Sequence, residues 1–330
     1  MKYKLLGGFL ALLTVAAATN GIVNQGEFSK LKVTATVVDE SHNPINETKV
    51  TLFYCEARNP NAIVKVEGLT DKEGKFTGEG YCSGSYGVNI RKDGFYQSGL
   101  GAPQLTNIVE GKWLPWNPTC ETILRPIGKP VAMYAKRVET IIPALDEPCG
   151  YDLEAGDWVT PYGIGMKKDF IFTFNQEWRS ISDYDVHGEM TFKNPLDGIQ
   201  ETSIPEIGKN SVFKWQRLAP ENSYVTNQEL RNAWFPDGSG QKPVRSFKSQ
   251  DVWDGYFFRV RTVEQEGQIV SAHYGKIRGG ISVYPDKKSG KPKIVFTYYL
   301  NPTSLDRNME FDPKKNLFKN LVGMEQVREP

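Results

Sequence analysis

The sequence predicts an all-β protein built from two successive β-sandwich domains. Short runs rich in β-branched and aromatic residues alternate with turn-forming Gly, Pro, Asn and Asp, and nearly all of these runs lack a helical period. The length of 330 residues exceeds what one hydrophobic core usually serves. Because 39% of the residues are hydrophobic, the chain has enough apolar side chains to bury a core.

The start of the chain has the order of a secretory signal peptide, which we place at residues 1–18. Lys2 and Lys4 precede an apolar run at 5–15, and three alanines ending at Ala18 follow it. We expect cleavage after Ala18 and a secreted or periplasmic location. An uncleaved anchor is the alternative, but the run is shorter than the ~20 apolar residues that span a bilayer, and no later segment reaches that length.

The charge of the chain indicates no electrostatic partner. Lys2 and Lys4 are the only charged residues of the signal peptide, so its removal changes the formal net charge from +1 to −1. Basic and acidic residues are interspersed along the sequence, whereas counterion-release binding to nucleic acid needs a concentrated basic surface. We therefore expect no nucleic-acid partner and no membrane span, and no feature of the sequence sets an oligomeric state.

Residues 30–128 are predicted to form the first sandwich, after an N-terminal lead at 19–29. Residues 31–38 alternate apolar and polar side chains at their start and close with paired valines, the pattern of a strand with one buried face. The other strands predicted in this domain lie at 48–54, 62–66, 75–81, 86–91 and 122–125. Runs at this spacing, separated by turn residues, indicate an all-β sandwich.

The same stretch resembles a known family. The residues that carry the resemblance are Val37-Val38-Asp39, Asn43-Pro44-Ile45, Val50, Thr70-Asp71-Lys72-Glu73-Gly74-Lys75-Phe76, Gly84-Ser85-Tyr86-Gly87-Val88 and Gly94-Phe95. Their order resembles the carboxypeptidase regulatory-like domain, which implies a transthyretin-like (prealbumin-like) Greek-key sandwich. Asp71 can cap its turn while Gly74 supplies a positive φ, and Phe76 and Tyr86 are expected in the core. The family usually has a Gly-Ala pair where this chain has Asn46-Glu47-Thr48.

The resemblance implies an accessory module and no activity. Such domains accompany metallocarboxypeptidase catalytic domains and occur in many secreted bacterial proteins, but they carry no catalytic residues. A zinc carboxypeptidase needs a His-x-x-Glu pair and a later His, and the three histidines of this chain, His42, His187 and His273, offer no such pair. We therefore expect no metal and no cofactor.

Four cysteines in an exported chain predict two disulfides. Cys55, Cys82, Cys120 and Cys149 allow three pairings, and we favour Cys55 with Cys82, since both belong to predicted strands of the first domain. Cys120 would then pair with Cys149 and link the end of the first domain to the second. A zinc site is the competing interpretation, but there is no Cys-x-x-Cys and no His beside any of the four.

Two tryptophans stand in a segment rich in Gly, Pro and Asn at 101–118, which we interpret as a connecting loop. Trp113 and Trp116 are each followed closely by a proline. Exposed indole rings can stack on the apolar faces of sugars, so these two residues are the candidates for ligand binding. The alternative is that they close one end of the sandwich.

A linker at 129–148 leads to the second predicted domain, which spans 149–330. The strands predicted there lie at 169–175, 187–193, 211–217, 256–263, 269–274, 280–284 and 294–300. Residues 227–234 are the one plausible short helix, 286–291 a polar hairpin tip, and 316–322 one or two amphipathic helical turns. The pattern indicates a second β-sandwich with long loops.

The search for catalytic motifs in the sequence is negative. It contains no Gly-x-Ser-x-Gly elbow, no P-loop, no His-Glu-x-x-His and no dinucleotide fingerprint. Asp183, Asp185, His187 and Glu189 are spaced two apart and would share one face of a strand. That face could form an acidic or metal-binding patch, although a solvated strand face explains it better.

Two functional hypotheses follow. The favoured one is a non-catalytic secreted binding or structural protein that holds a glycan or a surface protein on its aromatic-rich loops. The other is a hydrolase of glycans or peptides whose carboxylates, such as Asp152, Asp157, Asp183 and Asp185, converge only in three dimensions. Acid-base hydrolysis of glycans requires two carboxylates about 5–10 Å apart, so their separation distinguishes the two hypotheses.

Overall fold

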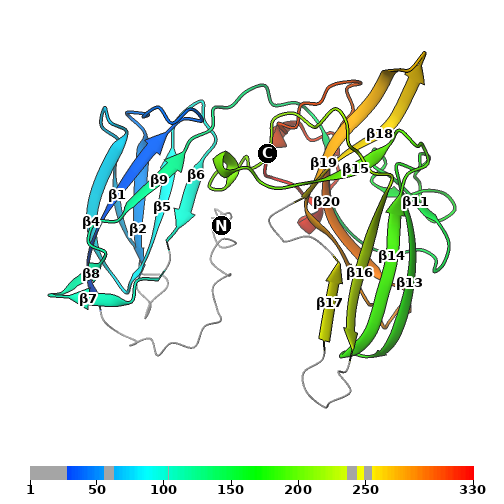
Figure 1. Cartoon of the computed structure of the whole chain (residues 1–330), viewed down its shortest axis with the longest axis horizontal. Coiled ribbons are helices and arrows are strands. Elements are labelled where there is room, and N and C mark those ends of the chain that lie inside the picture. Colours follow the sequence, from blue (N-terminus) through cyan, green and yellow to red (C-terminus); the bar gives the residue numbers. More distant parts are fainter. Residues whose placement is uncertain (1–27, 56–62, 103, 236–243, 249–254) are drawn as a thin grey trace, which may run out of the picture. The chain divides into compact units, whose positions relative to one another are not determined.

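The computed structural model describes residues 28–55, 63–102, 104–235, 244–248 and 255–330, with backbone alone at 244–248. The predicted signal peptide and most of the lead after it lie outside this range. The described elements are strands and three-residue 3-10 helices, which confirms the all-β fold class (Figure 1). No helix in the described ranges is long and apolar enough to cross a membrane.

The chain divides into two compact units. Unit 1 comprises Met1–Ile127 and Glu206–Lys214, and unit 2 comprises Gly128–Pro205 and Trp215–Pro330. The structure therefore places the boundary near residue 128, where the resemblance ends. It also assigns a short segment from the middle of the second predicted domain to unit 1.

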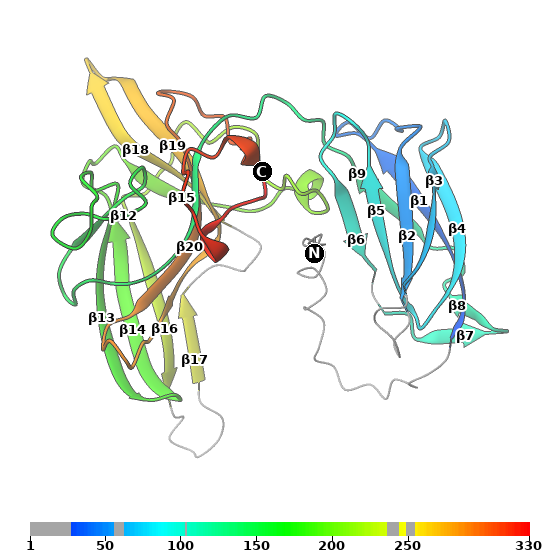
Figure 2. The ribbon, with the colours of Figure 1, turned by 180° about the vertical axis from the view of Figure 1, so that it is seen from behind.

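Unit 1 is a sandwich of two sheets. One sheet contains β4 (Lys75–Cys82), β1 (Ser29–Val38), β9 (Thr119–Ile123), β8 (Lys112–Leu114) and β7 (Asn107–Val109). The other has the order β3 (Ile63–Leu69), β2 (Lys49–Cys55), β5 (Ser85–Arg91) and β6 (Ser98–Gly101), as Figure 2 shows. β1 runs parallel to β9 and antiparallel to β4, so the first and last long strands of the unit are neighbours.

The core of unit 1 follows from the alternation in its strands. Leu31, Val33, Ala35 and Val37 of β1 have no exposed surface, and they pack with buried side chains of β2 and β5. Tyr86 lies in this core and Phe76 packs against it, as predicted.

The predicted turn before β4 also forms. Asp71 Oδ1 accepts hydrogen bonds from the backbone N–H groups of Glu73 and Lys75, at 3.0 and 2.8 Å. Gly74 has φ +72°, and a Cβ there would meet the carbonyl oxygen of Val37 at 2.5 Å. The turn thus needs both the acceptor and the glycine that the sequence supplies.

The segment at 101–118 is not a connector. Residues 107–109 and 112–114 form the hairpin β7–β8, and β8 pairs with β1 through Lys30 and Lys112. The closing strand of unit 1 is Thr119–Ile123, so the strand predicted at 122–125 begins and ends earlier than expected. The hairpin adds two strands to the sheet because Gly111, with φ +71°, allows a tight turn.

All four cysteines are free thiols in the structure. Cys55 ends β2 and Cys82 ends β4, and the Ser83 N–H donates to the Cys55 carbonyl oxygen at 3.0 Å, so the two strand ends are adjacent. Burial, with a smaller contribution from the neighbouring Cys55, raises the pKa of Cys82 to about 11. Cys120 and Cys149, by contrast, are buried in the separate cores of units 1 and 2.

We predict that exposure to an oxidising compartment links Cys55 to Cys82 and leaves Cys120 and Cys149 reduced. The cross-link would join the two sheets of unit 1 and add about 3–4 kcal/mol of stability through the entropy of the unfolded chain. Peptide mapping of the unreduced protein, alkylated after unfolding, should recover a Cys55–Cys82 peptide. A Cys120–Cys149 peptide, or four alkylated thiols, would contradict the expectation.

Unit 2 is a second sandwich with larger, wholly antiparallel sheets. Its five-stranded sheet has the order β10 (Tyr134–Ile141), β20 (Lys293–Asn301), β19 (Gln268–Tyr284), β18 (Gly255–Gln265) and β15 (Gly198–Thr202). Its six-stranded sheet has the order β12 (Asp157–Trp158), β11 (Cys149–Asp152), β13 (Phe170–Ser180), β14 (Asp183–Thr191), β16 (Asn227–Phe235) and β17 (Val244–Lys248). In the ranges that the structure describes, the 3-10 helices are Glu206–Gly208 in unit 1 and Pro313–Lys315 and Gly323–Glu325 in unit 2.

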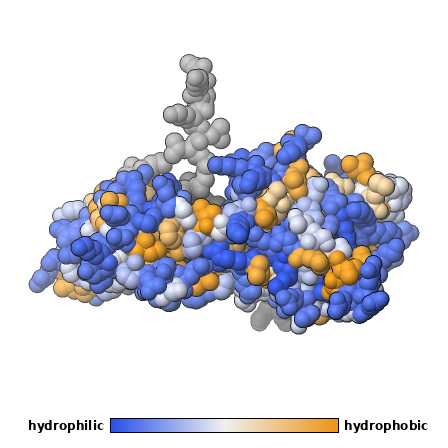
Figure 3. Space-filling model, turned by 90° about the horizontal axis from the view of Figure 1, so that it is seen from above, coloured by the Kyte–Doolittle hydropathy of each residue, from blue (hydrophilic) through white to orange (hydrophobic). Residues whose placement is uncertain are grey.

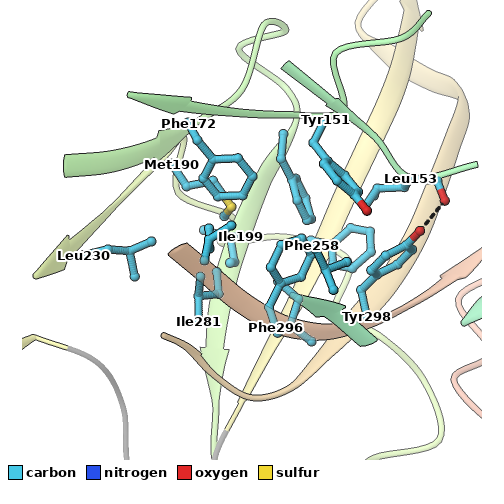
Figure 4. Packing of buried hydrophobic residues seen from close by; sticks show 14 of the residues in the cluster. Tyr151, Leu153, Phe172, Met190, Ile199, Leu230, Phe258, Ile281, Phe296 and Tyr298 are labelled. Atoms are coloured by element: carbon cyan, nitrogen blue, oxygen red, sulfur yellow. Dashed lines mark hydrogen bonds between the residues drawn. The ribbon is translucent and has the colours of Figure 1, made fainter. Parts of the chain in front are cut away.

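Aromatic rings from both sheets fill the core of unit 2. Figure 4 shows Tyr151 and Phe172 of the six-stranded sheet facing Phe258, Phe296 and Tyr298 of the other. Tyr298 is fully buried, and its hydroxyl donates to the carbonyl oxygen of Leu153 at 2.6 Å. Edge-to-face contacts dominate among these rings, for example between Phe170 and Phe258 at 5.1 Å and 82°.

The surface carries hydrophobic residues in small separate groups on the face that Figure 3 shows.

Several predictions for this half of the chain were wrong. Part of the expected linker at 129–148 is β10, a strand of the five-stranded sheet. Residues 227–234 form β16 instead of a helix, because Leu230, Asn232 and Trp234 alternate toward the core face while charged side chains alternate outward. Residues 316–322 form no helical turn. The hairpin tip at 286–291 is confirmed between β19 and β20.

Residues 211–217 do not form the predicted strand, and most of them belong to unit 1. The Gly99 N–H donates to the Asn210 carbonyl oxygen, and Val212 donates to the Gln97 carbonyl oxygen, at 2.8 and 3.0 Å. Phe213 is buried against Tyr96, with ring centroids 5.1 Å apart. The segment is therefore part of the edge of the β6 sheet.

Arg125 fixes this segment to unit 1. Its side chain is 1% exposed, and it donates to the Phe213 carbonyl oxygen at 2.7 Å and to Glu40 at 2.8 Å. The guanidinium carbon also lies 4.5 Å from the centre of the Phe213 ring. A buried cation with these partners holds the loop through charge, hydrogen bonding and stacking together.

We predict that Arg125→Ala lowers the free energy of unfolding of unit 1 by about 3–5 kcal/mol, the usual cost of breaking a buried ion pair. Urea denaturation followed by circular dichroism measures the change. Lys49→Ala is the matched control, because Lys49 also belongs to unit 1, is 55% exposed and makes an exposed ion pair with Glu67 that should contribute little to stability. Equal losses in the two variants would contradict this role.

Candidate functional site

Three aromatic side chains form a row across three neighbouring strands of unit 2. Trp178 of β13 pairs with Tyr184 of β14, and Tyr184 pairs with Trp234 of β16. Because alternate residues of a strand share one face, the row lies on the same face as the core residues Phe174 and Leu230. Figure 1 shows β13, β14 and β16 as long strands lying side by side. We call Trp178, Tyr184 and Trp234 the aromatic row.

The geometry of the aromatic row is fixed by stacking and by hydrogen bonds. The rings of Trp178 and Tyr184 lie 5.9 Å apart with an interplanar angle of 14°. Tyr184 is 7% exposed, and its hydroxyl donates to Asn232 Oδ1 at 3.1 Å. Asn232 in turn donates to the Val283 carbonyl oxygen at 2.7 Å. The tyrosine is therefore a rigid floor between two partly exposed indoles.

The indole of Trp234 leaves one polar atom unsatisfied. Its Nε1 is buried and has no hydrogen-bond partner among the described residues, although the ring as a whole is partly exposed. A buried donor without an acceptor costs about 1–3 kcal/mol. An oxygen atom of a ligand or a water molecule would remove this cost.

Among the described residues, hydrogen bonds between the two sheets of unit 2 reach the residues just before the aromatic row. Gln176, two residues before Trp178 on the same face, accepts from the Asp286 N–H at 3.0 Å and donates to the Asp286 carbonyl oxygen at 3.4 Å. Asp286 belongs to the tip of the β19–β20 hairpin. The row thus lies beyond the point where the hairpin tip contacts the six-stranded sheet.

A second cluster surrounds Arg261, at the opposite end of β13. The guanidinium donates to both oxygens of Asp169, at 2.8 and 2.7 Å, and lies 3.3 Å from Asp152 and 2.5 Å from Glu154. His273 Nδ1 lies 3.9 Å from the same Glu154 oxygen. We call these five residues the Arg261 cluster.

The carboxylates of this cluster differ in their environments. Burial raises the pKa of Asp169 above its ordinary value, although Arg261 partly offsets that effect. Burial also acts on Asp152 and Glu154. Backbone N–H donors outweigh it at Asp152, and Arg261 outweighs it at Glu154, so both have a lowered pKa. Burial and the positive charge of Arg261 lower the pKa of His273.

The backbone at Arg261 is itself unusual. Arg261 has φ +58° within a bulge of β18, a conformation that glycine or asparagine normally adopts. Asp197 holds the bulge by accepting the N–H groups of Arg261 and Thr262, at 3.0 and 2.9 Å. An arginine in a strained backbone position indicates that its side chain is needed there.

The four carboxylates of the hydrolase hypothesis do not converge. Asp152 and Asp157 pair across β11 and β12, whereas Asp183 and Asp185 lie on β14. Asp152 lies beside Asp169, at the start of β13, and Asp185 pairs with Glu177, eight residues later. At about 3.3 Å per residue the two pairs are roughly 26 Å apart, so a carboxylate of one pair cannot act together with a carboxylate of the other in acid-base catalysis.

Each of these four carboxylates also has a local partner. Asp152 accepts four backbone N–H groups, those of Glu154, Ala155, Met166 and Lys167. Asp157 accepts the N–H groups of Trp158 and Ile164. Arg231 donates to both oxygens of Asp185, at 3.0 and 2.6 Å, and Asp183 lies 3.4 Å from Arg179. These contacts organise loops and strands.

The strand face with Asp183, Asp185, His187 and Glu189 is the outer face of the six-stranded sheet. His187 is 49% exposed and lies 3.6 Å from Asp185, which Arg231 already binds. No group of three His, Cys, Asp or Glu suited to a metal ion occurs in the part of the chain that the structure describes. The solvated-face interpretation describes this surface best.

The structure separates the two tryptophans that the sequence singled out. Trp113 is 6% exposed, and its Nε1 donates to the Cys82 carbonyl oxygen at 2.8 Å, so it closes one end of the unit 1 core. Trp116 is partly exposed, and Lys112 Nζ lies 5.2 Å from the centre of its ring. A core position leaves no open ring face on Trp113 for a sugar.

Sequence reasoning missed the aromatic row for a specific reason. Trp178 and Tyr184 lie outside the strands predicted at 169–175 and 187–193, and Trp234 lies in the segment predicted as a helix, so the three residues were not aligned. A period of two over residues 227–234, together with strands extended to Trp178 and back to Tyr184, would have placed all three aromatic residues on the core-facing side of adjacent strands. Their cross-strand pairing could then have been proposed.

Among known proteins, matches to this chain were found in the solved structures alone. No family model and no curated protein sequence matches this chain. A 3-chlorocatechol 1,2-dioxygenase from Rhodococcus opacus 1CP aligns over 30% of this chain and 60% of its own, at 13% identity and a TM-score of 0.23. The streptococcal ancillary pilin aligns over 78% and 60%, at 9% identity and a TM-score of 0.20.

A third solved structure is a single-residue mutant of the shaft pilin spaA of Lactobacillus rhamnosus GG. It aligns over 67% of this chain and 99% of its own, at 10% identity and a TM-score of 0.21. This chain thus spans 60% of the length of the first two structures and nearly all of the third. Likeness this distant carries no argument about function.

We predict that the stability of unit 2 falls as the pH drops through about 6.5, because the folded-state pKa of His273 lies below its ordinary value of about 6.5. The unfolded chain then binds a proton that the folded chain resists, because His273 is buried and lies near Arg261 and Lys167, while Glu154 and Asp169 offset these effects only in part. Urea denaturation between pH 7.5 and 5.5 measures the slope. His273→Gln should flatten it and His187→Gln should not; an unchanged slope in His273→Gln refutes the assignment.

Proposed function

We propose that this chain is a non-catalytic secreted binding protein that holds carbohydrate on the aromatic row of unit 2. The observation that carries the proposal is the row itself. Trp178, Tyr184 and Trp234 occupy one cross-strand line, and the Trp234 Nε1 lacks an acceptor among the described residues. The site thus combines apolar ring surface with a donor that still needs an oxygen.

Carbohydrate is the ligand class that fits this combination. A pyranose ring has an apolar face of C–H groups, which packs on an aromatic plane, and a polar rim of hydroxyls. The partly exposed indoles offer the planes, and Trp234 Nε1 offers a donor to a hydroxyl oxygen. The rigid floor of Tyr184 and Asn232 supports the proposal further, because little entropy is lost when a preorganised site binds.

The absence of a catalytic role is part of the proposal. The carboxylates considered for hydrolysis lie in two distant pairs, and each accepts hydrogen bonds or ion pairs from its own surroundings. The Arg261 cluster places its three carboxylates around one guanidinium, which offsets part of their negative charge. Both facts support structural roles for these groups.

Unit 1 is, in this proposal, a carboxypeptidase regulatory-like scaffold. The turn at Asp71 and Gly74, the core positions of Phe76 and Tyr86, and the sandwich of two sheets support that assignment. Export supports the same view, since the signal-like residues 1–18 and the adjacent Cys55 and Cys82 suit an oxidising compartment. A surface protein as partner is the remaining alternative to a glycan.

The test is a glycan array followed by calorimetry on the best ligand. We predict that Trp178→Ala weakens binding about tenfold or more, which corresponds to about 1.4 kcal/mol. Trp234→Phe keeps a ring but removes the N–H, and it should weaken binding about fivefold, a loss of about 1 kcal/mol for one hydrogen bond.

Trp116→Ala is the matched control, because Trp116 is the partly exposed tryptophan of unit 1. Binding that survives in Trp178→Ala but is lost in Trp116→Ala would move the site to unit 1 and refute the proposal. Binding of no glycan at all would refute the ligand class. Thermal unfolding of each variant establishes that the sandwich is intact.

A further inference from the structure

Strand β3 is a long and regular edge of unit 1. It is the outermost strand of the four-stranded sheet, and it pairs with β2 over Ile63–Leu69 without a shift in register (Figure 2). In the ranges that the structure describes, the side of β3 away from β2 has no backbone hydrogen-bond partner. An edge strand in this state is a template on which another strand can pair.

Two other edge strands of the protein are closed by their own chain. The Gly99 N–H of β6 donates to the Asn210 carbonyl oxygen at 2.8 Å. Ile199 of β15 exchanges two backbone hydrogen bonds with Val225, at 2.9 and 2.8 Å. β4, which ends the other sheet of unit 1, contains two glycines, and glycine inside a strand weakens its pairing. β3 therefore differs from these edges in being ready to extend its sheet.

Opposite charges stand on either side of Val66 in this strand. Val66 packs against the core of unit 1, so Lys65 and Glu67 lie on the outer face of the sheet. Their contacts agree with this placement. Lys65 Nζ lies 5.7 Å from the centre of the Phe53 ring, and Glu67 Oε1 accepts from Thr51 Oγ1 at 2.8 Å. Lys65 is exposed and the Glu67 side chain is 47% exposed, so both can meet a partner.

This order is self-complementary when two copies of β3 run antiparallel with Val66 opposite Val66. Each residue then faces the one equally far from Val66 on the other strand, so Lys65 of each copy faces Glu67 of the other. Ile63 and Leu69, which are 39% and 61% exposed, face each other at both ends. Moving the register by two residues in either direction places Lys65 opposite Lys65 or Glu67 opposite Glu67, which is unfavourable.

Glu67 can accept a second cation although Lys49 already binds it. Lys49 Nζ lies 3.1 Å from Glu67 Oε2, but a carboxylate has about four lone-pair sites on its two oxygens. Hydrogen bonds from Thr51 and Lys49 lower the pKa of Glu67, with a smaller contribution from the charge of Lys65, so the group stays ionised at neutral pH. The ammonium group of Lys65 contacts an aromatic ring in this chain, which leaves it available to a carboxylate of a second copy.

We propose that the chain forms a two-fold symmetric dimer in which β3 pairs with β3 of a second copy. A second copy fits this edge better than an unrelated strand, because the same chain supplies both members of each Lys65–Glu67 pair. The pairing joins two four-stranded sheets into one continuous sheet. A single strand pair buries less than the roughly 1,200–2,000 Å² of a stable interface, so we expect a reversible dimer.

Such a dimer carries two aromatic rows. Two sites on one assembly hold a polymeric glycan more tightly than one site does, because the second contact is intramolecular. This consequence rests on the function proposed above, whereas the pairing of β3 does not.

The experiment is sedimentation velocity of the chain, freed of residues 1–18, from about 1 µM to about 200 µM, a range that spans micromolar dissociation constants. The parent should pass from monomer to dimer as its concentration rises. Lys65→Glu places carboxylates opposite each other, and Glu67→Lys places ammonium groups opposite each other, so each variant alone should dimerise about tenfold more weakly or worse. An equal mixture of the two variants restores both pairs of opposite charge and should form a heterodimer with an affinity close to that of the parent.

Lys112→Glu is the matched control, because Lys112 is an exposed lysine on β8, in the other sheet of unit 1, and the change in charge is the same. This variant should dimerise as the parent does. Recovery of dimer in the mixture shows that both single variants are folded, and thermal unfolding of each variant checks the same point independently.

Four results would overturn the proposal: a parent that stays monomeric at the highest concentration, single variants that dimerise as the parent does, a mixture that forms no heterodimer, or a loss in Lys112→Glu as large as in Lys65→Glu. No glycan is present in this experiment, so its outcome and that of the glycan array are independent.

Discussion

The buried pairing of Arg261 with carboxylates is the interaction on which the architecture of unit 2 depends. Asp152 and Asp169 can be buried because a guanidinium and backbone N–H groups surround them. The same two aspartates order the chain between β11 and β13, including the loop at 160–168, by accepting backbone N–H groups. Burying these charges is costly unless every partner is in place, so the bulge at Arg261, the turn at Glu154 and the loop form together or not at all.

The sequence allowed the fold class and most strands to be predicted, because period-two alternation and turn residues are local signals. The turn at Asp71 and Gly74 and the hairpin tip at 286–291 are examples. The pattern failed where the decisive contact is distant in sequence. Residues 227–234 have a composition compatible with a helix, but pairing with β14 makes them a strand. Phe213 was part of a predicted strand, but its carbonyl oxygen accepts a hydrogen bond from Arg125, 88 residues earlier in the chain.

The candidate site shows the same division between local signals, which the sequence reveals, and distant contacts, which it does not. Aromatic residues could be identified from composition, yet only the strand register brings Trp178, Tyr184 and Trp234 into one line. Trp113 shows the opposite error. A tryptophan between glycine and proline suggests an exposed loop, whereas the hairpin β7–β8 directs the Trp113 side chain into the core of unit 1. The sequence likewise could not show how far apart the carboxylates lie in space. The structure places Asp152 and Asp185 near opposite ends of β13.

The length of β13 separates the Arg261 cluster from the aromatic row. The cluster contacts the chain at Asp169, just before β13 begins, and the aromatic row crosses its far end at Trp178, about 30 Å away at about 3.3 Å per residue. A ligand on the row therefore does not reach the charged groups of the cluster. Because both stand on one antiparallel sheet stabilised by a single aromatic core, the buried charges can fix one end of β13 while its other end carries the row.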